Sequence, residues 1–277
     1  GVDKGESIPM ETRVLGWNGK NLGWGNVVNR VDSGFQEIFA YKTRTGVLRV
    51  TANHRVLITR KQSNPKSGRG GYRAVTWKST WIFACDIKIG DFLCIPHNFA
   101  NEKIKSDIEL AEWLGLVCGD GHVLKRHKVG ITHHAEATYI AHYRDFIERR
   151  YGKPFKYIEH NRTSYVYSAV AAEDARCFVG KTAHHKRIPV YLWSASREEQ
   201  ISFLRGYGDA DGTIRNDGCI EFYSCSRLLL EEIRQLCRML GFSVGQVSTR
   251  EYIGSGFSKK GIRTISTLRC YNASKIG

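Results

Sequence analysis

Apolar and polar residues alternate in short runs through the first part of the chain, as in strands that bury one face. Turn residues such as Asn18-Gly19 and Asp32-Ser33-Gly34 separate these runs. Many short strands joined by glycine-containing turns predict an all-β domain over residues 1–97. The strands are expected at 13–16, 25–31, 37–42, 47–51 and 55–59.

The segment 60–78 differs from these strands, because it holds six basic residues, no acidic residue and several Gly and Pro positions. This composition predicts a loop or a hairpin arm. A basic arm with Tyr72 and Trp77 beside it is suited to a nucleic-acid backbone. A solvated loop without a ligand is the alternative interpretation.

After Pro96 the apolar spacing changes to that of helices mixed with strands, and one order of elements occurs twice. We therefore predict a multidomain protein in which an α+β domain follows the β domain. Its repeats are expected at 104–195 and 196–277, related by a pseudo-twofold axis in αββαββ order. Helices are expected at 107–119, 135–151, 196–207, 226–240 and within 173–179, and strands at 128–132, 155–159, 164–169, 213–215, 219–223, 244–250 and 263–270.

Each repeat opens with a copy of one motif, WLGLVCGDG at 113–121 and LRGYGDADG at 204–212. Small residues in both copies predict that the two helices approach closely, with a glycine at the end of each as a helix C-cap. Asp120 and Asp211 occupy the same place in the copies, so both carboxylates are expected in one small volume. Two core helices with ordinary caps are the alternative, which the second matched copy disfavours.

Paired carboxylates repel unless a cation lies between them, and their hard oxygen atoms favour Mg²⁺. We expect a metal site formed by Asp120 and Asp211 with the adjoining residues Gly119 and Ala210. Mn²⁺ or Ca²⁺ is expected to substitute for Mg²⁺ in binding. Such an ion activates water and neutralises charge during phosphodiester hydrolysis. No small-molecule cofactor is expected.

The formal net charge of +15 indicates a polyanionic partner. Residues 1–100 carry +8 of this charge, a larger share than their length. No apolar run is long enough for a membrane span, no signal peptide is visible, and the eight cysteines form no C-x-x-C pair. We therefore expect an intracellular protein, in a prokaryotic or phage-infected cell or in a eukaryotic nucleus or organelle, without a membrane partner.

The doubled motif resembles that of the LAGLIDADG homing endonucleases in their single-chain, two-repeat form. The resemblance implies a monomer with a saddle of β-strands over double-stranded DNA, the motif helices at its centre, and cleavage of both strands at a long site. Lys186-Arg187-Ile188-Pro189, 25 residues before Asp211, resembles the K-x-I-P segment of intein-borne members. It implies that Lys186 assists catalysis, with a basic partner in the second repeat, for which Lys260 stands beside Lys259 and Arg263 as a candidate.

The DNA-contacting residues are expected on the basic arm and on the strands and turns of the two repeats. They are Lys61, Lys66, Arg69, Arg73, Lys78, Lys125, Arg126, Lys128, Arg215, Arg250, Lys259 and Arg263.

The first domain resembles the Hint (splicing) domain of inteins. Ser7 begins a Ser-x-x-x-acid-Thr-x-Val segment, and Thr51-Ala52-Asn53-His54 matches T-x-x-H. The resemblance implies that Ser7 is the splicing nucleophile, His54 the proton donor and Thr51 a positioning residue. The closing residues, 271–277, do not match the strand ending in His-Asn, so splicing within this chain is not expected. A split intein with a complementary C-terminal fragment, a truncated chain and an endonuclease descended from an intein all stay open.

Three functions therefore compete. The first is a Mg²⁺-dependent, site-specific endonuclease whose β domain aids DNA binding. The second is a DNA-binding protein or RNA maturase on the same scaffold without cleavage. The third is a protein-splicing fragment whose endonuclease part is a passenger.

Overall fold

The computed structural model describes residues 13–17, 22–29, 31–43, 46–63, 75–94, 106–124, 126–176, 183–254 and 261–271. The chain divides into two compact units, Gly1–Pro96 and His97–Gly277. None of the helices in these described ranges is long and apolar enough to cross a membrane.

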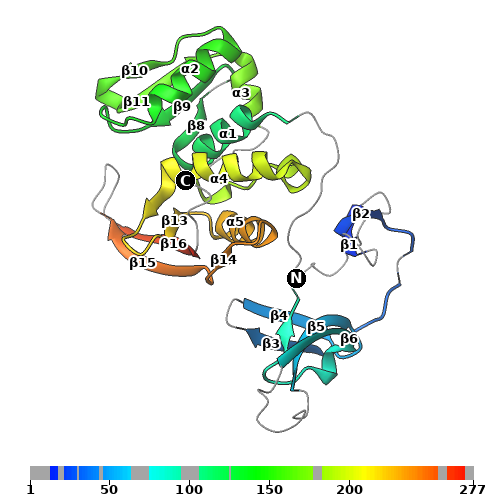
Figure 1. Ribbon diagram of the computed structural model, residues 1–277. Coiled ribbons are helices and arrows are strands. Elements are labelled where there is room, and N and C mark those ends of the chain that lie inside the picture. Colours follow the sequence, from blue (N-terminus) through cyan, green and yellow to red (C-terminus); the bar gives the residue numbers. More distant parts are fainter. Residues whose placement is uncertain are drawn as a thin grey trace. The chain divides into compact units, whose positions relative to one another are not determined.

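The described part of the first unit consists of antiparallel strands and one 3-10 helix (Figure 1). β1 pairs with β2, β3 with β4, and β5 lies between β6 and β7. The strand expected at 25–31 is wrong in its bounds, because β2 ends at Asn26. The bounds are β1 Arg13–Trp17, β2 Leu22–Asn26, β3 Ile38–Thr43, β4 Gly46–Thr51, β5 Arg55–Ser63, β6 Val75–Phe83, η1 Ala84–Asp86 and β7 Phe92–Leu93.

Burial in this first unit is sparse. Only Ile58 and Ala84 are buried apolar residues among those that the structure describes there, whereas Phe35, Trp81 and Ile89 are exposed. β5 and β6 pair out to Ser63 and Val75, so strand pairing extends into the segment expected as an arm. Residues 64–74 lie outside the described part.

The second unit has the twice-repeated order of helices and strands. Its first sheet has the order β10-β11-β9-β8, and its second the order β12-β13-β16-β14, with β15 paired to β16. The first repeat comprises α1 Ile108–Asp120, β8 Gly121–Leu124, β9 Lys128–Thr132, α2 Ile140–Tyr151, β10 Lys156–Ile158, η2 Glu159–Asn161, β11 Thr163–Tyr167, α3 Ala169–Arg176, η3 Ala183–His185 and η4 Val190–Ser194. The second comprises α4 Arg197–Asp211, β12 Gly212–Ile214, β13 Ile220–Ser224, α5 Arg227–Met239, β14 Ser243–Val244, β15 Ser248–Gly254 and β16 Gly261–Tyr271.

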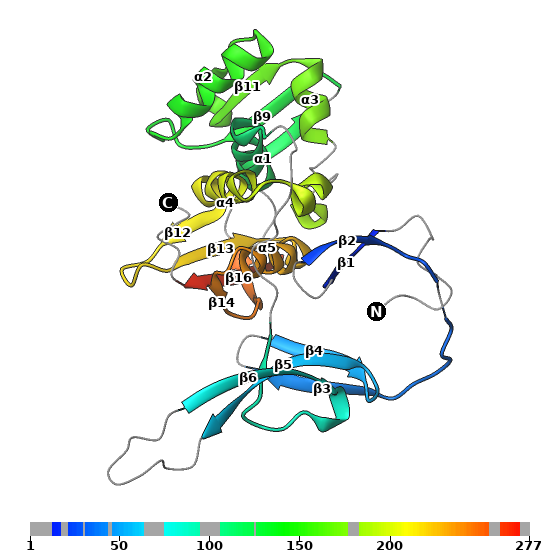
Figure 2. The same cartoon turned by 45° about the vertical axis from the view of Figure 1, so that its right-hand side comes forward.

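The helices α1 and α4 pack against each other between the two sheets (Figures 1 and 2). A Cβ atom on Gly115 would overlap the carbonyl oxygen of Phe203, and one on Gly206 would overlap the carbonyl oxygen of Glu112. Glycine at both positions is therefore what lets the two backbones meet. The buried core of the unit, which includes Trp113, surrounds this helix pair.

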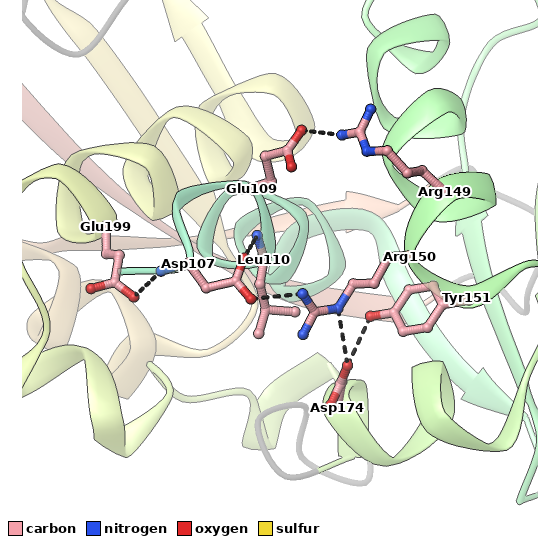
Figure 3. Close-up of polar contacts among 8 residues, drawn as sticks. All are labelled: Asp107, Glu109, Leu110, Arg149, Arg150, Tyr151, Asp174 and Glu199. Carbon is pink, nitrogen blue, oxygen red and sulfur yellow. Dashed lines mark hydrogen bonds and ion pairs between the residues drawn. The ribbon is translucent and has the colours of Figure 1, made fainter. Parts of the chain in front are cut away.

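A polar network fixes the N-terminal ends of the pair (Figure 3). Asp107 caps α1 by accepting a hydrogen bond from the backbone N–H of Leu110. Its own N–H donates to Glu199 at 3.0 Å, and Glu199 completes a capping box with Ser196 on α4. Arg150 of α2 also contacts Asp107, at 2.6 Å. The Glu199 carboxylate of α4 thus holds the start of α1. The Asp107 carboxylate at the start of α1 holds Arg150 of α2.

Candidate active site at the ends of the paired helices

Asp120 and Asp211 are the last residues of α1 and α4, and a strand follows each directly. The expected glycine C-caps are confirmed at Gly121 and Gly212, in an extended conformation with φ of −83° and −109°. Glycine is needed there for space. A Cβ on Gly121 would lie 2.5 Å from the Cα of Val117, and one on Gly212 would be equally crowded by the preceding helical turn.

The two carboxyl groups lie in an environment that disfavours their charged forms. Burial, followed by the negative charge of Asp211, raises the pKa of Asp120 to about 7. Burial also raises the pKa of Asp211 to about 6. The positive charge of Lys186 acts in the opposite direction on both. Desolvated carboxylates that repel each other fit a divalent cation, which would offset both penalties.

The donor set available to such a cation is small. Within the described ranges no group of three or more His, Cys, Asp or Glu residues is placed to hold a metal. Asp120 and Asp211 would therefore be completed by backbone carbonyl oxygens and water, a set that suits Mg²⁺, which retains several water ligands. Gly119 and Ala210 are in contact, since a Cβ on Gly119 would overlap the Cβ of Ala210.

Lys186 lies at this site and is 8% exposed. Its ammonium group donates a hydrogen bond to the carbonyl oxygen of Gly119. Burial lowers its pKa, while nearby acidic groups, Asp211 and Asp120 among them, oppose that change. Ser226 at the start of α5 donates to the Lys186 carbonyl at 3.0 Å, which fixes the lysine's backbone.

The segment after Lys186 is held to α5 as well. Glu232 accepts hydrogen bonds from the Arg187 guanidinium and, at 2.9 Å, from the backbone N–H of Ile188. The carbonyl of Arg187 accepts a bond from the thiol of the buried Cys118. Three helices, α1, α4 and α5, thus meet at the Lys186 segment beside the two aspartates.

A second pair of acidic side chains, Asp209 and Glu112, lies on the same two helices and was not singled out in the sequence. Asp209 of α4 accepts a hydrogen bond from the Tyr143 hydroxyl at 2.7 Å. Glu112 of α1 is buried, and its carboxylate lies 3.5 Å from His142 and 3.9 Å from Arg205. Burial raises the pKa of both Glu112 and Asp209. Only Asp209 had a sequence signal, since it is the first acid of GDADG.

The outer face of the first sheet presents a lysine on aromatic rings. Val129 and Ile131 of β9 are buried, so alternation along the strand places Lys128 on the opposite face. Its ammonium group lies 3.7 Å from the ring centre of Tyr165 and 5.0 Å from that of Tyr167. The ring pair holds the cation at a defined place on this face.

The outer face of the second sheet carries a different cluster. Glu221 of β13 accepts hydrogen bonds from Arg269 at 2.6 Å and from Arg215 and Tyr223 at 2.8 Å each. The Arg269 bond, and then the other donors, lower the pKa of Glu221 to about 2. The neighbouring Phe222 points into the core. Alternation in the sequence indicated which residues share a face, but not that they form this cluster.

The remaining residues predicted to contact DNA or to take part in splicing or catalysis are partly within the described residues and partly outside them. Lys61, Lys78, Arg126 and Arg250 are exposed, and Arg263 lies in β16. Thr51 and His54 form a turn in which the His54 N–H donates to the Thr51 carbonyl at 3.1 Å. The others lie outside the described residues: Ser7, Lys66, Arg69, Arg73, Lys125, Lys259 and Lys260.

Several curated proteins are similar to this chain. A SufBD-family iron–sulfur cluster assembly protein of Mycobacterium leprae is 23% identical over 80% of the chain and 28% of its own length. Replication factor C small subunits are 27% identical over 72% of the chain in Thermococcus kodakarensis and 30% identical over 65% in Methanocaldococcus jannaschii. The chain covers 21% and 9% of these two proteins, so it spans less than a third of each relative.

Among solved structures, the homing endonuclease I-DmoI in complex with its target DNA is 17% identical, with a TM-score of 0.40 over 61% of this chain and 89% of that one. Full-length WhiA is 14% identical, with a TM-score of 0.39 over 64% and 55%. A family model described as a LAGLIDADG-like domain matches residues 198–256. The matched segment runs from the second residue of α4, through Asp211, to the end of β15 and two residues beyond.

Proposed function

We propose that this protein is a metal-dependent, site-specific endonuclease that hydrolyses both strands of double-stranded DNA at a long target site. The observation that carries the proposal is the convergence of Asp120, Asp211 and Lys186 at the ends of two tightly paired helices. The net charge of +15 supports DNA as the substrate. The protein acts as a monomer, since one chain supplies both aspartates, and needs no small-molecule cofactor.

Two roles are assigned to the site residues: the aspartates bind the cation, and the lysine stabilises negative charge. Asp120 and Asp211 hold the cation, which when bound supplies a more acidic water and neutralises charge on the phosphate. Lys186 keeps its positive charge within reach of the same phosphate and stabilises negative charge that develops in the transition state. The outer faces of the two sheets, with Lys128, Arg215 and Arg250, extend the contact along the DNA.

The relatives support an intein-like origin. One bacterial and two archaeal proteins of two unrelated descriptions each match most of this chain, yet the match fills under a third of each. A segment shared by proteins of different function is typical of a mobile insert. We extend the proposal accordingly: residues 1–97 are a Hint-like β domain that aids DNA binding, and the protein acts inside the cell.

The test is cleavage of a randomised double-stranded DNA library in Mg²⁺, Mn²⁺ or Ca²⁺, with Asp120→Asn, Asp211→Asn as the matched control. Discrete cleavage at an enriched long site with Mg²⁺, absent in the control, is the expected result. Sequence-selective binding without cleavage would replace the endonuclease by a catalytically silent DNA-binding relative. Preferred binding of RNA over the library would favour a maturase instead.

A splicing function has a specific observation in its favour. The T-x-x-H segment forms a turn, and the first unit leaves apolar side chains such as Phe35 and Trp81 exposed, as a domain awaiting further strands would. Mixing the protein with a C-terminal intein fragment and following ligated product by mass spectrometry tests it. Ligation that is lost in His54→Ala would establish splicing as an activity beside DNA cleavage.

A further inference from the structure

The carboxylate of Glu221 in β13 binds two arginines. Arg215 follows the end of β12 on one side, and Arg269 lies in β16 on the other. Thr213 and Arg269 are the register partners of Glu221 in β12 and β16. Arg215 lies two residues beyond Thr213 and so shares that face. The carboxylate is largely buried beneath its partners, with 8% of the side chain exposed, whereas the side chains of Arg215 and Arg269 are 44% and 45% exposed.

The hydrogen bonds to Glu221 use one edge of each guanidinium. Arg269 donates through Nε to Oε1 of Glu221, which leaves both of its terminal amino groups. Arg215 donates through one terminal nitrogen to Oε2, which leaves its Nε–NH2 edge. Each arginine therefore retains two adjacent donors, the arrangement that pairs with O6 and N7 of guanine in the major groove.

Stability alone is a weak reason for this cluster. Ion pairs whose arginine is nearly half exposed contribute about 0–1 kcal/mol each. One carboxylate between two guanidinium groups also leaves an excess positive charge on the sheet. A rigid carboxylate beneath two arginines instead removes the side-chain entropy that each would lose on binding a base.

We propose that Glu221 is a positioning residue that presents Arg215 and Arg269 to two guanines in the half-site under the second sheet. The inference rests on the proposed function, because it assigns bases to the DNA that the protein binds. Where the second sheet pairs Glu221 with Arg269, the first sheet pairs Gly130 with Tyr165. Lys128 lies over the ring of Tyr165 there. The guanine requirement therefore belongs to one half-site, and the target is asymmetric.

The chain also sets the distance from the cleavage centre. Arg215 follows Asp211 by four residues of extended or nearly extended chain, which is about 13 Å at ~3.3 Å per residue. DNA rises about 3.4 Å per base pair, so the Arg215 guanine is expected ~4 base pairs from the centre. Arg269 lies two strands away, about 10 Å at ~4.8 Å per strand, which places its guanine within about three base pairs of the first.

The experiment is a binding selection from randomised double-stranded DNA in Ca²⁺, with Asp120→Asn, Asp211→Asn as the parent so that cleavage does not intervene. We expect the parent to enrich a site with two G·C pairs in one half. In the same background, Glu221→Gln should lower the preference for guanine about 10-fold at both positions. Arg269→Lys should lower the preference for guanine only at the position that Arg269 contacts, because lysine keeps the charge and loses the paired donors.

Arg250→Gln is the matched control, since it removes one charge from the same sheet without touching Glu221. Arg250 pairs with Ile265 in the register that places both on the outer face. This variant should weaken binding to all sequences alike and keep both guanines. Equal guanine enrichment by the parent and Glu221→Gln overturns the inference and leaves the proposed function standing. A parent that enriches no sequence overturns both.

Discussion

The ammonium group of Lys186 donates a hydrogen bond to the carbonyl oxygen of Gly119, the residue directly before Asp120. The bond joins the segment that precedes the second motif helix to the end of the first. Helix C-termini carry partial negative charge, which favours a cation at this place. Lys186 therefore stabilises the end of α1 and supplies positive charge to both aspartates in one position.

We predict that Lys186→Met lowers the rate of cleavage by about 100-fold or more, while the Kd for target DNA changes only a few-fold. In the proposed function the charge that assists the phosphate is lost, whereas the outer sheet faces proposed to bind DNA are unchanged. Single-turnover cleavage at saturating protein measures the rate, and a mobility-shift assay the Kd. Lys186→Arg is the control and should recover part of the rate. A rate unchanged in Lys186→Met would remove the lysine from the mechanism.

The raised pKa values of the two aspartates predict a pH-dependent cost to stability in metal-free protein. The folded values are about 7 for Asp120 and about 6 for Asp211, against 3.8 for an ordinary aspartate. The folded state thus binds more protons than the unfolded state between pH 4 and these values, so this contribution to stability falls as pH rises. It is fully present below the unfolded pKa and lost above the folded one.

Removing both charges should therefore stabilise the metal-free protein at pH 8 and not at pH 4. We expect Asp120→Asn, Asp211→Asn to raise the free energy of unfolding by about 2–4 kcal/mol at pH 8. Urea melts in EDTA at both pH values measure the difference. Ca²⁺ added at pH 8 should raise the Tm of the wild type and leave the variant unchanged. A variant less stable than the wild type at pH 8 contradicts the assigned burial.

The fold of the second unit was largely predictable because its signals are local. The glycine-spaced motifs and the alternating segment 128–132 each determine an element without help from distant residues. The helix expected at 135–151 begins only at Ile140, because His134–Ala137 forms a turn whose hydrogen bond the sequence pattern does not reveal.

The site was predictable only where the residues carry a motif. The expectation that Asp120, Asp211 and Lys186 lie together came from repetition and resemblance, whereas Tyr143 and Glu221 depend on contacts between distant elements. Tyr143 meets Asp209 across 66 residues, and Arg269 meets Glu221 across 48. Such pairs depend on strand register and helix packing, which spacing along one chain does not specify.

The network at the other end of the helix pair makes a separate prediction. Glu199 is 4% exposed and accepts hydrogen bonds from the N–H groups of Asp107 and Ser196 and from the Ser196 hydroxyl. Glu199→Leu removes the acceptor from these part-buried donors, so we expect a loss of about 1–3 kcal/mol in the free energy of unfolding, measured by a urea melt. Glu198→Leu, one residue earlier and exposed, is the control and should change stability little. Equal losses in the two variants would deny the network a role in joining α1 to α4.

The close approach of the motif helices yields the sharpest comparison, because α4 contains a crowded and an open glycine two residues apart. A Cβ on Gly206 would overlap the carbonyl oxygen of Glu112, whereas one on Gly208 would have only Phe222 nearby, at an ordinary 3.8 Å. Gly206→Ala must push the two backbones apart, and we expect it to cost about 3 kcal/mol or more, at the upper end of overpacking effects. Gly208→Ala should gain about 0.5–1 kcal/mol, since alanine favours a helix interior over glycine. Urea melts of both variants measure these changes, and cleavage should be lost with the first, because separating the helices also separates Asp120 from Asp211. Similar stability in the two variants would mean that backbone contact does not set the distance between the aspartates.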